Sequence, residues 1–317
     1  MKYRYILPVF IGVVSATLGL SGQDKKSTAE LLGYPADAKL LIIHADDMGM
    51  SHSTNMSVIK AFENGAVTSG STMVPCPWFN EIADYVKLHP ALDVGIHFTL
   101  NAEWKFYKWD GISSSVEIPS LITKDGFFYA DLQPLIFGAK PAEVEKELRA
   151  QIDRAIACGI KPTHIDSHMG SLYANPAFFK AALAVGKEYH LPVFVPLDAM
   201  KQAAPFLLKD IPPDLIVIDH FLMLPGDAVK GDWKKLYSDF MKNLVPGLNE
   251  MVVHLSYDNE EMQAIATEHE DYGSAWRQKD LDLVLSDDFQ TMLKENHVQL
   301  VTWRQIQQVM YPEESNQ

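Results

Sequence analysis

The sequence predicts an α/β protein, a (β/α) barrel of seven to eight parallel strands that is a variant of the TIM barrel. Short runs rich in β-branched residues alternate with helical patterns from about residue 36 onward. Several runs are almost continuously apolar, as expected for parallel strands buried on both faces. No break in composition divides these units, which favours one large domain. An open, doubly wound sheet is the alternative.

The elements follow one another in a regular order. Helical spacing covers residues 53–64, which Gly65 closes, and residues 141–158, which begin with a proline and stop at Gly159. Another helix begins at Pro176. The strand candidates are KLLIIH (39–44), SGSTMV (69–74), DVGIHFTL (93–100), THIDSH (163–168), LPVFVP (191–196), LIVIDHF (215–221), EMVVHLSY (250–257) and VQLVTW (298–303).

One connection, between residues 100 and 140, is unusually long, and long loops in compact domains are often functional. Aromatic side chains on such a loop could stack on sugar rings, but we expect most of them to form the loop's own small core. Trp104 and Trp109 are the candidates for ligand contact. The aromatic residues are Trp104, Phe106, Tyr107, Trp109, Phe127, Phe128 and Tyr129.

Composition and charge exclude several classes of protein. With 47% hydrophobic and 21% charged residues, the chain is not mostly disordered, collagen-like or a coiled coil. A formal charge of −14 and no long Lys/Arg run argue against nucleic acid or anionic membrane as the main partner. The two cysteines, Cys76 and Cys158, cannot form a disulfide framework or a four-thiolate metal site, and whether they pair stays open.

The N-terminus, residues 1–22, has the pattern of a signal peptide. Lys2 and Arg4 precede a short apolar run, and small residues lead into polar sequence. We expect export to the periplasm or the medium, without stable membrane insertion after signal removal; an uncleaved anchor is the alternative. The remaining chain divides into an N-terminal extension (23–36), the barrel domain (37–311) and a polar tail (312–317).

Acidic and histidine residues lie at the ends of four predicted strands. Carboxyl ends of barrel strands converge on one mouth, so we expect these side chains to be neighbours. One carboxylate and two imidazoles form a common metal-ligand set with positions open for water and substrate. Adjacent carboxylates diverge in an extended segment, so one binds the ion and the other takes a proton from water. The residues are Asp46, Asp47, His97, Asp166, His168 and His254.

A further histidine across the mouth could protonate a leaving group, and together these parts suit hydrolysis of an amide or ester. A histidine in an apolar strand is more often a satisfied core residue than a ligand. We expect several of the other histidines to be of that ordinary kind: His44, His52, His89, His190, His220 and His269.

At these positions the sequence resembles the YdjC/ChbG-type carbohydrate deacetylases, relatives of the polysaccharide deacetylases. The resemblance covers residues 39–306, and its ordered motifs are LIIHADDMGMSHSTN, GAVTSGSTMV, HPALDVGIHFTL, KPTHIDSHMG, EMVVHLSY and RQKDLDLVLSDDFQTMLKENHVQLVTW. Two segments differ from the family pattern. His168 is not followed by further histidines, and Leu255 and Ser256 replace the proline and glycine of an H-P-G-like segment.

The resemblance implies a barrel-like fold, one divalent metal ion and an acetylated sugar or oligosaccharide as substrate. Asp47, His97 and His168 match the metal ligands of the family, Asp46 the catalytic base and His254 the second acid/base. In addition, Asp166 projects to the same face as His168 and could orient a ligand or the proton-transfer network. Zn²⁺ suits an Asp-His-His set, whereas the family is often assigned Mg²⁺, so both ions stay open.

The sequence therefore predicts an exported, metal-dependent hydrolase that removes acetyl groups from N-acetylated sugars. An O-acetyl carbohydrate esterase with the same metal site is one alternative. A glycan-binding protein that kept the fold and lost catalysis is another, but binding alone would not require both a spare carboxylate and an acid.

Overall fold

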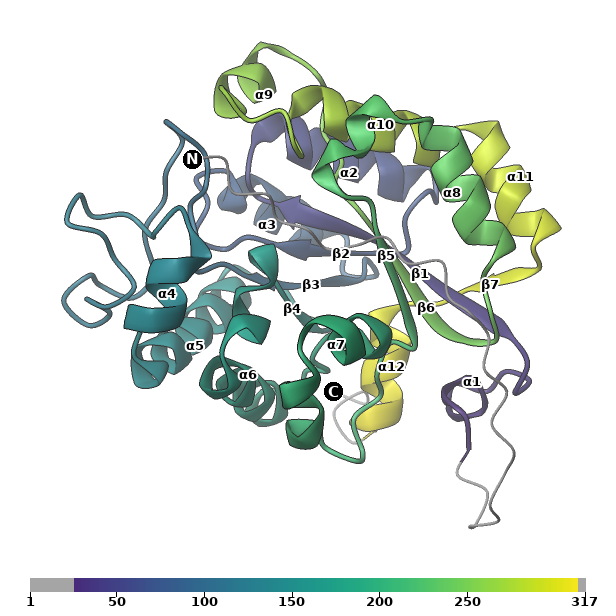
Figure 1. Ribbon diagram of the computed structural model, residues 1–317, viewed down its shortest axis with the longest axis horizontal. Coiled ribbons are helices and arrows are strands. Elements are labelled where there is room, and N and C mark those ends of the chain that lie inside the picture. The colour runs from purple at the N-terminus through teal and green to yellow at the C-terminus, as the bar shows by residue number, and fades with distance from the viewer. Residues whose placement is uncertain (1–25, 313–317) are drawn as a thin grey trace.

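Strands alternate with helices along the chain (Figure 1). The computed structural model describes residues 26–312, so the predicted signal peptide and residues 313–317 of the predicted tail lie outside the described part. The α-helices are α1 (Thr28–Leu31), α2 (His52–Glu63), α3 (Phe79–Leu88), α4 (Leu132–Gly138), α5 (Pro141–Ala157), α6 (Pro176–Glu188), α7 (Leu197–Ala203), α8 (Trp233–Lys242), α9 (Glu260–Ile265), α10 (Ser274–Val284), α11 (Asp287–Glu295) and α12 (Trp303–Met310). Short 3₁₀ helices are η1 (His168–Ala174), η2 (Pro205–Asp210) and η3 (Gly226–Lys230).

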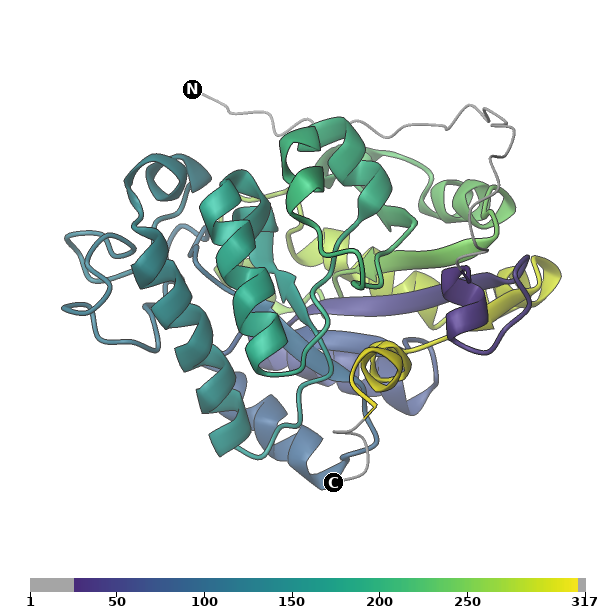
Figure 2. The ribbon, with the colours of Figure 1, turned by 90° about the horizontal axis from the view of Figure 1, so that it is seen from below.

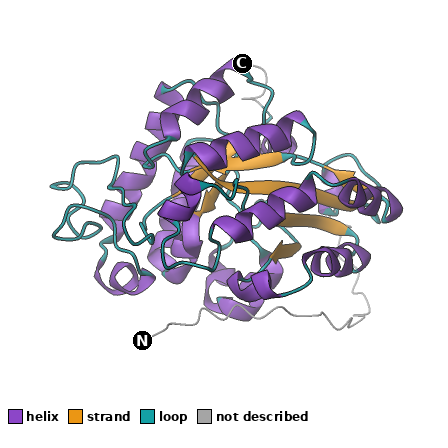
Figure 3. Ribbon diagram, turned by 90° about the horizontal axis from the view of Figure 1, so that it is seen from above, coloured by secondary structure: helices purple, strands orange, loops and turns teal. Residues whose placement is uncertain are grey.

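The strands form one parallel sheet that curves into a half-barrel, with helices on both sides (Figure 3). The strand order is β4-β3-β2-β1-β6-β5, and β7 pairs with the first residues of β1. The α/β class and the parallel pairing are as predicted. The strands are β1 (Lys39–Met48), β2 (Ser69–Thr72), β3 (Val94–Phe98), β4 (Ile165–Ser167), β5 (His220–Met223), β6 (Gly247–Val253) and β7 (Val298–Leu300).

The complete barrel predicted from the sequence is not formed by regular strands. The segment expected as a strand over residues 191–196 makes only isolated parallel bridges, from Val193 to Ile165 and from Pro196 to Ile218. Pro192 and Pro196 have no N–H to donate to a ladder, so this segment cannot pair continuously with both neighbours. Between β4 and β5 the sheet is therefore continued by these bridges and not by a regular strand.

Alternation along β1 divides the protein into an outer apolar core and an inner space that is polar near the strand ends. Leu41, Ile43 and Ala45 pack outward in the main core, whereas Leu40 and Ile42 belong to a second cluster inside the curved sheet. That inner cluster also contains residues of α1 and α12, which lie together near the start of β1 (Figure 2). Apolar side chains thus close one end of the half-barrel, and the other end carries the polar residues of β1.

Helix α5 fixes the long loop that follows β3. Three of its side chains, spaced four residues apart, bind loop backbone. Glu143 accepts from the N–H of Ser120 at 2.7 Å, and Glu147 accepts from the N–H groups of residues 112 and 113, both at 2.9 Å. Gln151 accepts from the N–H of Thr99 at 3.1 Å and donates to its carbonyl at 2.8 Å. The loop is therefore held along its length.

The loop after β3 folds over several of its own aromatic side chains. Trp104 and Trp109 are buried in the main core, as is Phe128. The indole N–H of Trp109 donates to the carbonyl of Asn101 at 2.8 Å. Both indoles therefore belong to the loop's own core, as expected for most of its aromatic side chains, and contact of Trp104 or Trp109 with a ligand stays a prediction. Among the described residues, no helix has the length and apolar character needed to span a membrane.

The fully buried Glu147 carboxylate should contribute strongly to stability. We expect Glu147→Ala to lower the free energy of unfolding by about 2–4 kcal/mol, because two loop N–H groups lose their buried acceptor. Urea unfolding of the purified chain measures this. Glu145→Ala is the matched control on the solvent side of the same helix and should cost less than about 1 kcal/mol. Equal losses in the two variants would contradict the anchoring role.

Candidate active site

The structure brings all six predicted site residues together. Asp46 and Asp47 lie near the end of β1, His97 in β3, Asp166 in β4 with His168 directly after it, and His254 directly after β6. All six side chains are buried or nearly so, and the most exposed are Asp46 and His254, each at 9%. Residues far apart in the sequence therefore meet where the parallel strands end.

The end of β1 is irregular, and this irregularity changes how the two aspartates lie. The pairing of β1 with β2 shifts register between Ala45 and Met48, and Asp47 has a left-handed φ of 66°. Both carboxylates consequently face His97, whose Nε2 lies 3.4 Å from Asp47 Oδ1 and 4.0 Å from Asp46 Oδ2. The expectation that the neighbouring carboxylates diverge is wrong, because the backbone is not extended there.

Asp47, His97 and His168 have the geometry of metal ligands. Asp47 Oδ1 lies 3.4 Å from Nε2 of His97 and 3.4 Å from Nδ1 of His168, and it has no hydrogen-bond partner among the described residues. Two ligands bound at about 2.0–2.1 Å to a tetrahedral ion lie about 3.3 Å apart. The three ligand atoms all lie within 4.8 Å of one another. This donor set fits a divalent cation.

Each of the two imidazoles is held by a carboxylate that is buried or nearly buried. Asp166 Oδ1 lies 2.7 Å from Nδ1 of His97, which leaves Nε2 facing Asp47. Glu103 Oε2 lies 2.9 Å from Nε2 of His168, which leaves Nδ1 facing Asp47. Carboxylates on the far nitrogens thus turn the remaining nitrogen of each imidazole toward Asp47.

Arg277 of α10 completes this arrangement by donating from Nη2 to Asp47 Oδ2 at 2.6 Å. The same guanidinium donates from Nε to the carbonyl of Tyr272 at 2.7 Å. Sequence analysis missed both Glu103 and Arg277. Glu103 lies in the long loop and Arg277 in a helix, so neither belongs to a strand end. The signal for Glu103 was its place in the long connection, and the signal for Arg277 was its place in a family motif.

The pKa shifts follow from these partners. Burial alone would raise the pKa of Asp47, but Arg277 and the two imidazoles hold it well below its usual value. Burial lowers the pKa of His168, yet Glu103 and Asp47 raise it to about 9. Burial likewise lowers the pKa of His97, while Asp166 and Asp46 raise it well above its usual value. The carboxylates of Asp46, Asp47, Glu103 and Asp166 therefore make the site negative, and this negative charge stabilises a positive charge on the imidazoles or between the ligand atoms.

On the other side of Asp46 stands His254, whose Nε2 lies 3.6 Å from Asp46 Oδ2. Its backbone N–H donates to Asp280 at 3.0 Å, and its ring packs against Tyr272 and Trp276. Burial lowers the pKa of His254 to about 4, so its imidazole is neutral near pH 7. A neutral imidazole beside a carboxylate can accept a proton and pass it on.

Two further groups of acidic and histidine residues lie close enough to be considered as metal sites, but both contain contacts at hydrogen-bond distance. In one, His97 Nδ1 is 2.7 Å from Asp166; in the other, His44 Nε2 is 3.0 Å from Asp166. These separations suit a shared proton better than a shared ion. Of the three groups, Asp47, His97 and His168 therefore fit a shared ion best.

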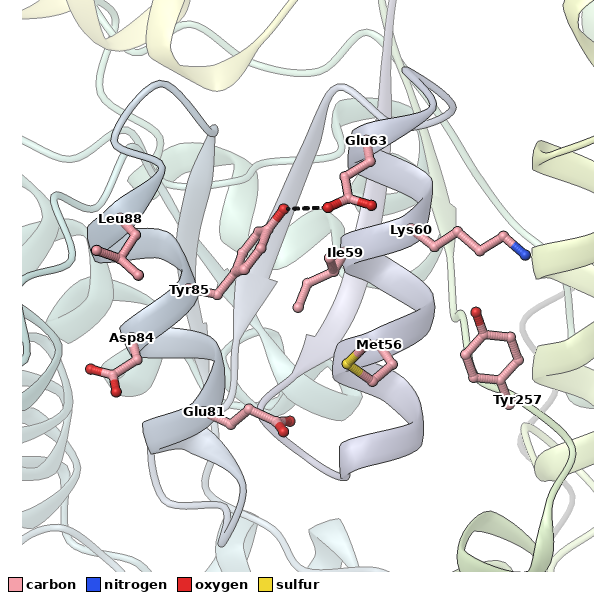
Figure 4. Close-up of a pocket in the computed structure, with 9 residues that line it drawn as sticks. All are labelled: Met56, Ile59, Lys60, Glu63, Glu81, Asp84, Tyr85, Leu88 and Tyr257. Atoms are coloured by element: carbon pink, nitrogen blue, oxygen red, sulfur yellow. Dashed lines mark hydrogen bonds between the residues drawn. The ribbon is translucent and has the colours of Figure 1, made fainter.

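A separate groove of about 600 Å³ lies on the outer surface along α2 and α3 (Figure 4). Tyr85 Oη donates to Glu63 across it at 3.1 Å. None of the six candidate site residues lines this groove, so it contributes nothing to the site. Its lining residues are Met56, Ile59, Lys60, Glu63, Glu81, Asp84, Tyr85, Leu88 and Tyr257.

Comparisons with known proteins agree with these observations. The profile of the YdjC-like protein family matches residues 40–295. A carbohydrate deacetylase of Brevibacillus brevis is 40% identical over 156 residues, which cover 49% of this chain and 59% of that protein. A carbohydrate deacetylase of Thermoanaerobacter pseudethanolicus is 27% identical over 267 residues, covering 84% of this chain and 98% of that protein.

The match to the Brevibacillus protein thus spans less than two thirds of that relative, whereas the Thermoanaerobacter protein is matched over almost its whole length. A crystal structure of a proposed cellobiose-phosphate cleavage protein from Enterococcus faecalis V583 has a similar fold. Its TM-score is 0.69 at 22% identity, and the match covers 85% of this chain and 99% of that one.

The Glu103–His168 contact should matter for metal binding. We expect Glu103→Ala to weaken Zn²⁺ binding by about 10–100-fold, because His168 loses the carboxylate that fixes its ring and tautomer. Competition with a chromophoric chelator measures the affinity. Glu117→Ala, an exposed glutamate of the same loop, is the control and should bind as the unchanged protein does. Unchanged affinity in Glu103→Ala would contradict the role of this contact.

Proposed function

The chain belongs to the YdjC-like family, and from this premise we propose that it is a metal-dependent carbohydrate deacetylase acting on N-acetylated sugars or oligosaccharides. The observation that carries the proposal is the ligand set of Asp47, His97 and His168 with a second carboxylate, Asp46, and a neutral imidazole, His254, beside it. The names of the relatives support a carbohydrate substrate.

Asp47, His97 and His168 would hold the ion. A divalent cation bound there would polarise the acyl carbonyl and make a water molecule more acidic. Two imidazoles and one carboxylate favour Zn²⁺, whereas Mg²⁺ prefers oxygen ligands. Arg277 donates a hydrogen bond to Oδ2 of Asp47, and Oδ1 is left to bind the ion.

Asp46 is the base in this proposal. Its Oδ2 faces His97 and His254, at 4.0 and 3.6 Å, so it borders the same space as the ligand atoms. Asp46 removes a proton from the attacking water as the new C–O bond forms at the acyl carbon. Among the described residues Asp46 pairs with histidines and not, as Asp47 does, with an arginine, so no fixed guanidinium charge occupies the carboxylate that acts as base.

His254 carries that proton to the leaving group. Because its imidazole starts neutral, it can receive the proton from Asp46 and donate it to the sugar nitrogen as the C–N bond breaks. The products are then acetate and the free amine, and both side chains return to their starting states. An amine leaves only when protonated, so amide cleavage depends on this step more than ester cleavage does.

The near-complete burial of the site suits a small acyl group that projects from a larger molecule. Asp47 and His97 are almost fully covered, while Asp46 and His254 are slightly more open. We also propose that the enzyme is exported and acts on glycans outside the cytoplasm, on the basis of the signal peptide predicted for residues 1–22.

The first test is acetate release from a panel of N-acetyl and O-acetyl mono- and oligosaccharides. Metal-stripped protein should be inactive, and reloading with Zn²⁺ or Mg²⁺ should restore release from N-acetyl sugars. Asp46→Asn should remain inactive after reloading, because an amide cannot take the proton. Release from O-acetyl sugars alone would replace the proposal with an esterase, and no release with metal bound would favour a glycan-binding protein.

The role of His254 gives a separate prediction. We expect His254→Ala to lower kcat by about 10²–10⁴-fold on an N-acetyl sugar. The loss on the matching O-acetyl sugar should be at least about tenfold smaller, because an alkoxide is a better leaving group than an unprotonated amine. His89→Ala, a histidine at the end of α3 outside the site, is the control. Equal losses on the two substrates would reject proton donation by His254.

A further inference from the structure

His44 lies inside the half-barrel, directly behind the two acidic residues of the site. It is fully buried on β1, two residues before Asp46, so their side chains point to the same side of the sheet. Its Nε2 lies 3.2 Å from Asp46 Oδ1, 3.0 Å from Asp166 Oδ2 and 3.1 Å from the hydroxyl of Ser71. One ring nitrogen thus faces both carboxylates, although sequence analysis grouped His44 with ordinary histidines.

The surroundings of His44 allow its ring little freedom. His164 meets it edge to face, with the ring centres 5.0 Å apart, and Trp303 stacks on the other side of His164 at 4.9 Å. A Cβ atom at Gly95 would lie 2.4–2.6 Å from the His164 ring, so this ring occupies the space that a side chain would need. The packed rings of His164 and Trp303 therefore restrict the position of His44.

The contacts of Asp46 divide between its two oxygens. Oδ1 faces His44, whereas Oδ2 faces His254 at 3.6 Å and His97 at 4.0 Å. Rotation about the terminal bond of an aspartate is soft, so the direction of Oδ2 depends on what holds Oδ1. Among the described residues, His44 is the group at ion-pair distance from Oδ1, which makes no hydrogen bond to any of them.

We propose that His44 is a positioning residue that holds Asp46 in the orientation from which it acts as base, and that keeps Asp166 directed at His97. This inference rests on the proposed function, in which Asp46 takes the proton from water. Because His44 is fully buried beneath these side chains, it cannot touch the substrate. Its loss should therefore change kcat much more than KM.

The test compares three variants of the full chain in the acetate-release assay. His44→Phe fills the space without an N–H group, and His44→Gln restores an N–H donor. We expect kcat of His44→Phe to fall about 100-fold, which is the scale of the loss when a catalytic group is misplaced. KM and Zn²⁺ affinity of this variant should stay within about threefold of those of the unchanged protein. His44→Gln should recover at least about tenfold of that loss. Ile42→Val, two residues before His44 on β1 and part of the inner apolar cluster, controls for a packing disturbance on the same side of the sheet and should keep kcat within about threefold.

Three results would overturn the proposal: unchanged kcat in His44→Phe, an equal loss in Ile42→Val, or no recovery in a His44→Gln variant that thermal unfolding shows to be folded. If the unchanged protein releases no acetate from any substrate, the proposed function fails. Crystal structures of the His44 variants then test independently whether His44 positions Asp46. Asp46 turned away or disordered in His44→Phe, and in place in His44→Gln, would support the positioning role. Asp46 in the same orientation in all variants would reject it.

Discussion

Two carboxylate–imidazole pairs, Asp166 with His97 and Glu103 with His168, are the interactions on which the rest of the site depends. Each pair occupies one ring nitrogen and points the other at Asp47. Such pairs are strong only where water is excluded, and leaving any member unpaired there would be costly. The protein must therefore bury a polar cluster inside the sheet and obtain its stability elsewhere, from the apolar outer core.

The same requirement explains why a long, irregular loop is fixed so firmly. Glu103 reaches His168 from the loop that follows β3, so the position of a proposed metal ligand depends on a segment without regular structure. Helix α5 compensates by binding the loop backbone with Glu143, Glu147 and Gln151. Buried backbone N–H groups need acceptors in any case, and here the acceptors also fix the loop relative to β3.

Much of the fold and the first layer of the site follow from patterns that one sequence can show. Continuous apolar runs predicted parallel strands, and acidic and histidine residues at their ends predicted a common site, because parallel strands share one edge. The absence of a regular strand over residues 191–196 also had a signal in the sequence, because Pro192 and Pro196 have no N–H to donate to a neighbouring strand. What remained hidden depended on tertiary contacts: Glu103 comes from a loop and Arg277 from a helix, and nothing local distinguishes them from surface charges.

The different roles proposed for the adjacent aspartates follow from their partners rather than from their chemistry. Asp47 is closed in by Arg277 and two imidazoles at 1% exposure, so its charge is fixed and one oxygen is left for an ion. Asp46 has no arginine partner among the described residues and is the more open of the two, with one oxygen facing His44 and the other beside His254. Environment assigns one carboxylate to hold charge and the other to exchange protons. The irregular end of β1 makes this possible, because a regular strand would have sent one of the two side chains to the outer core.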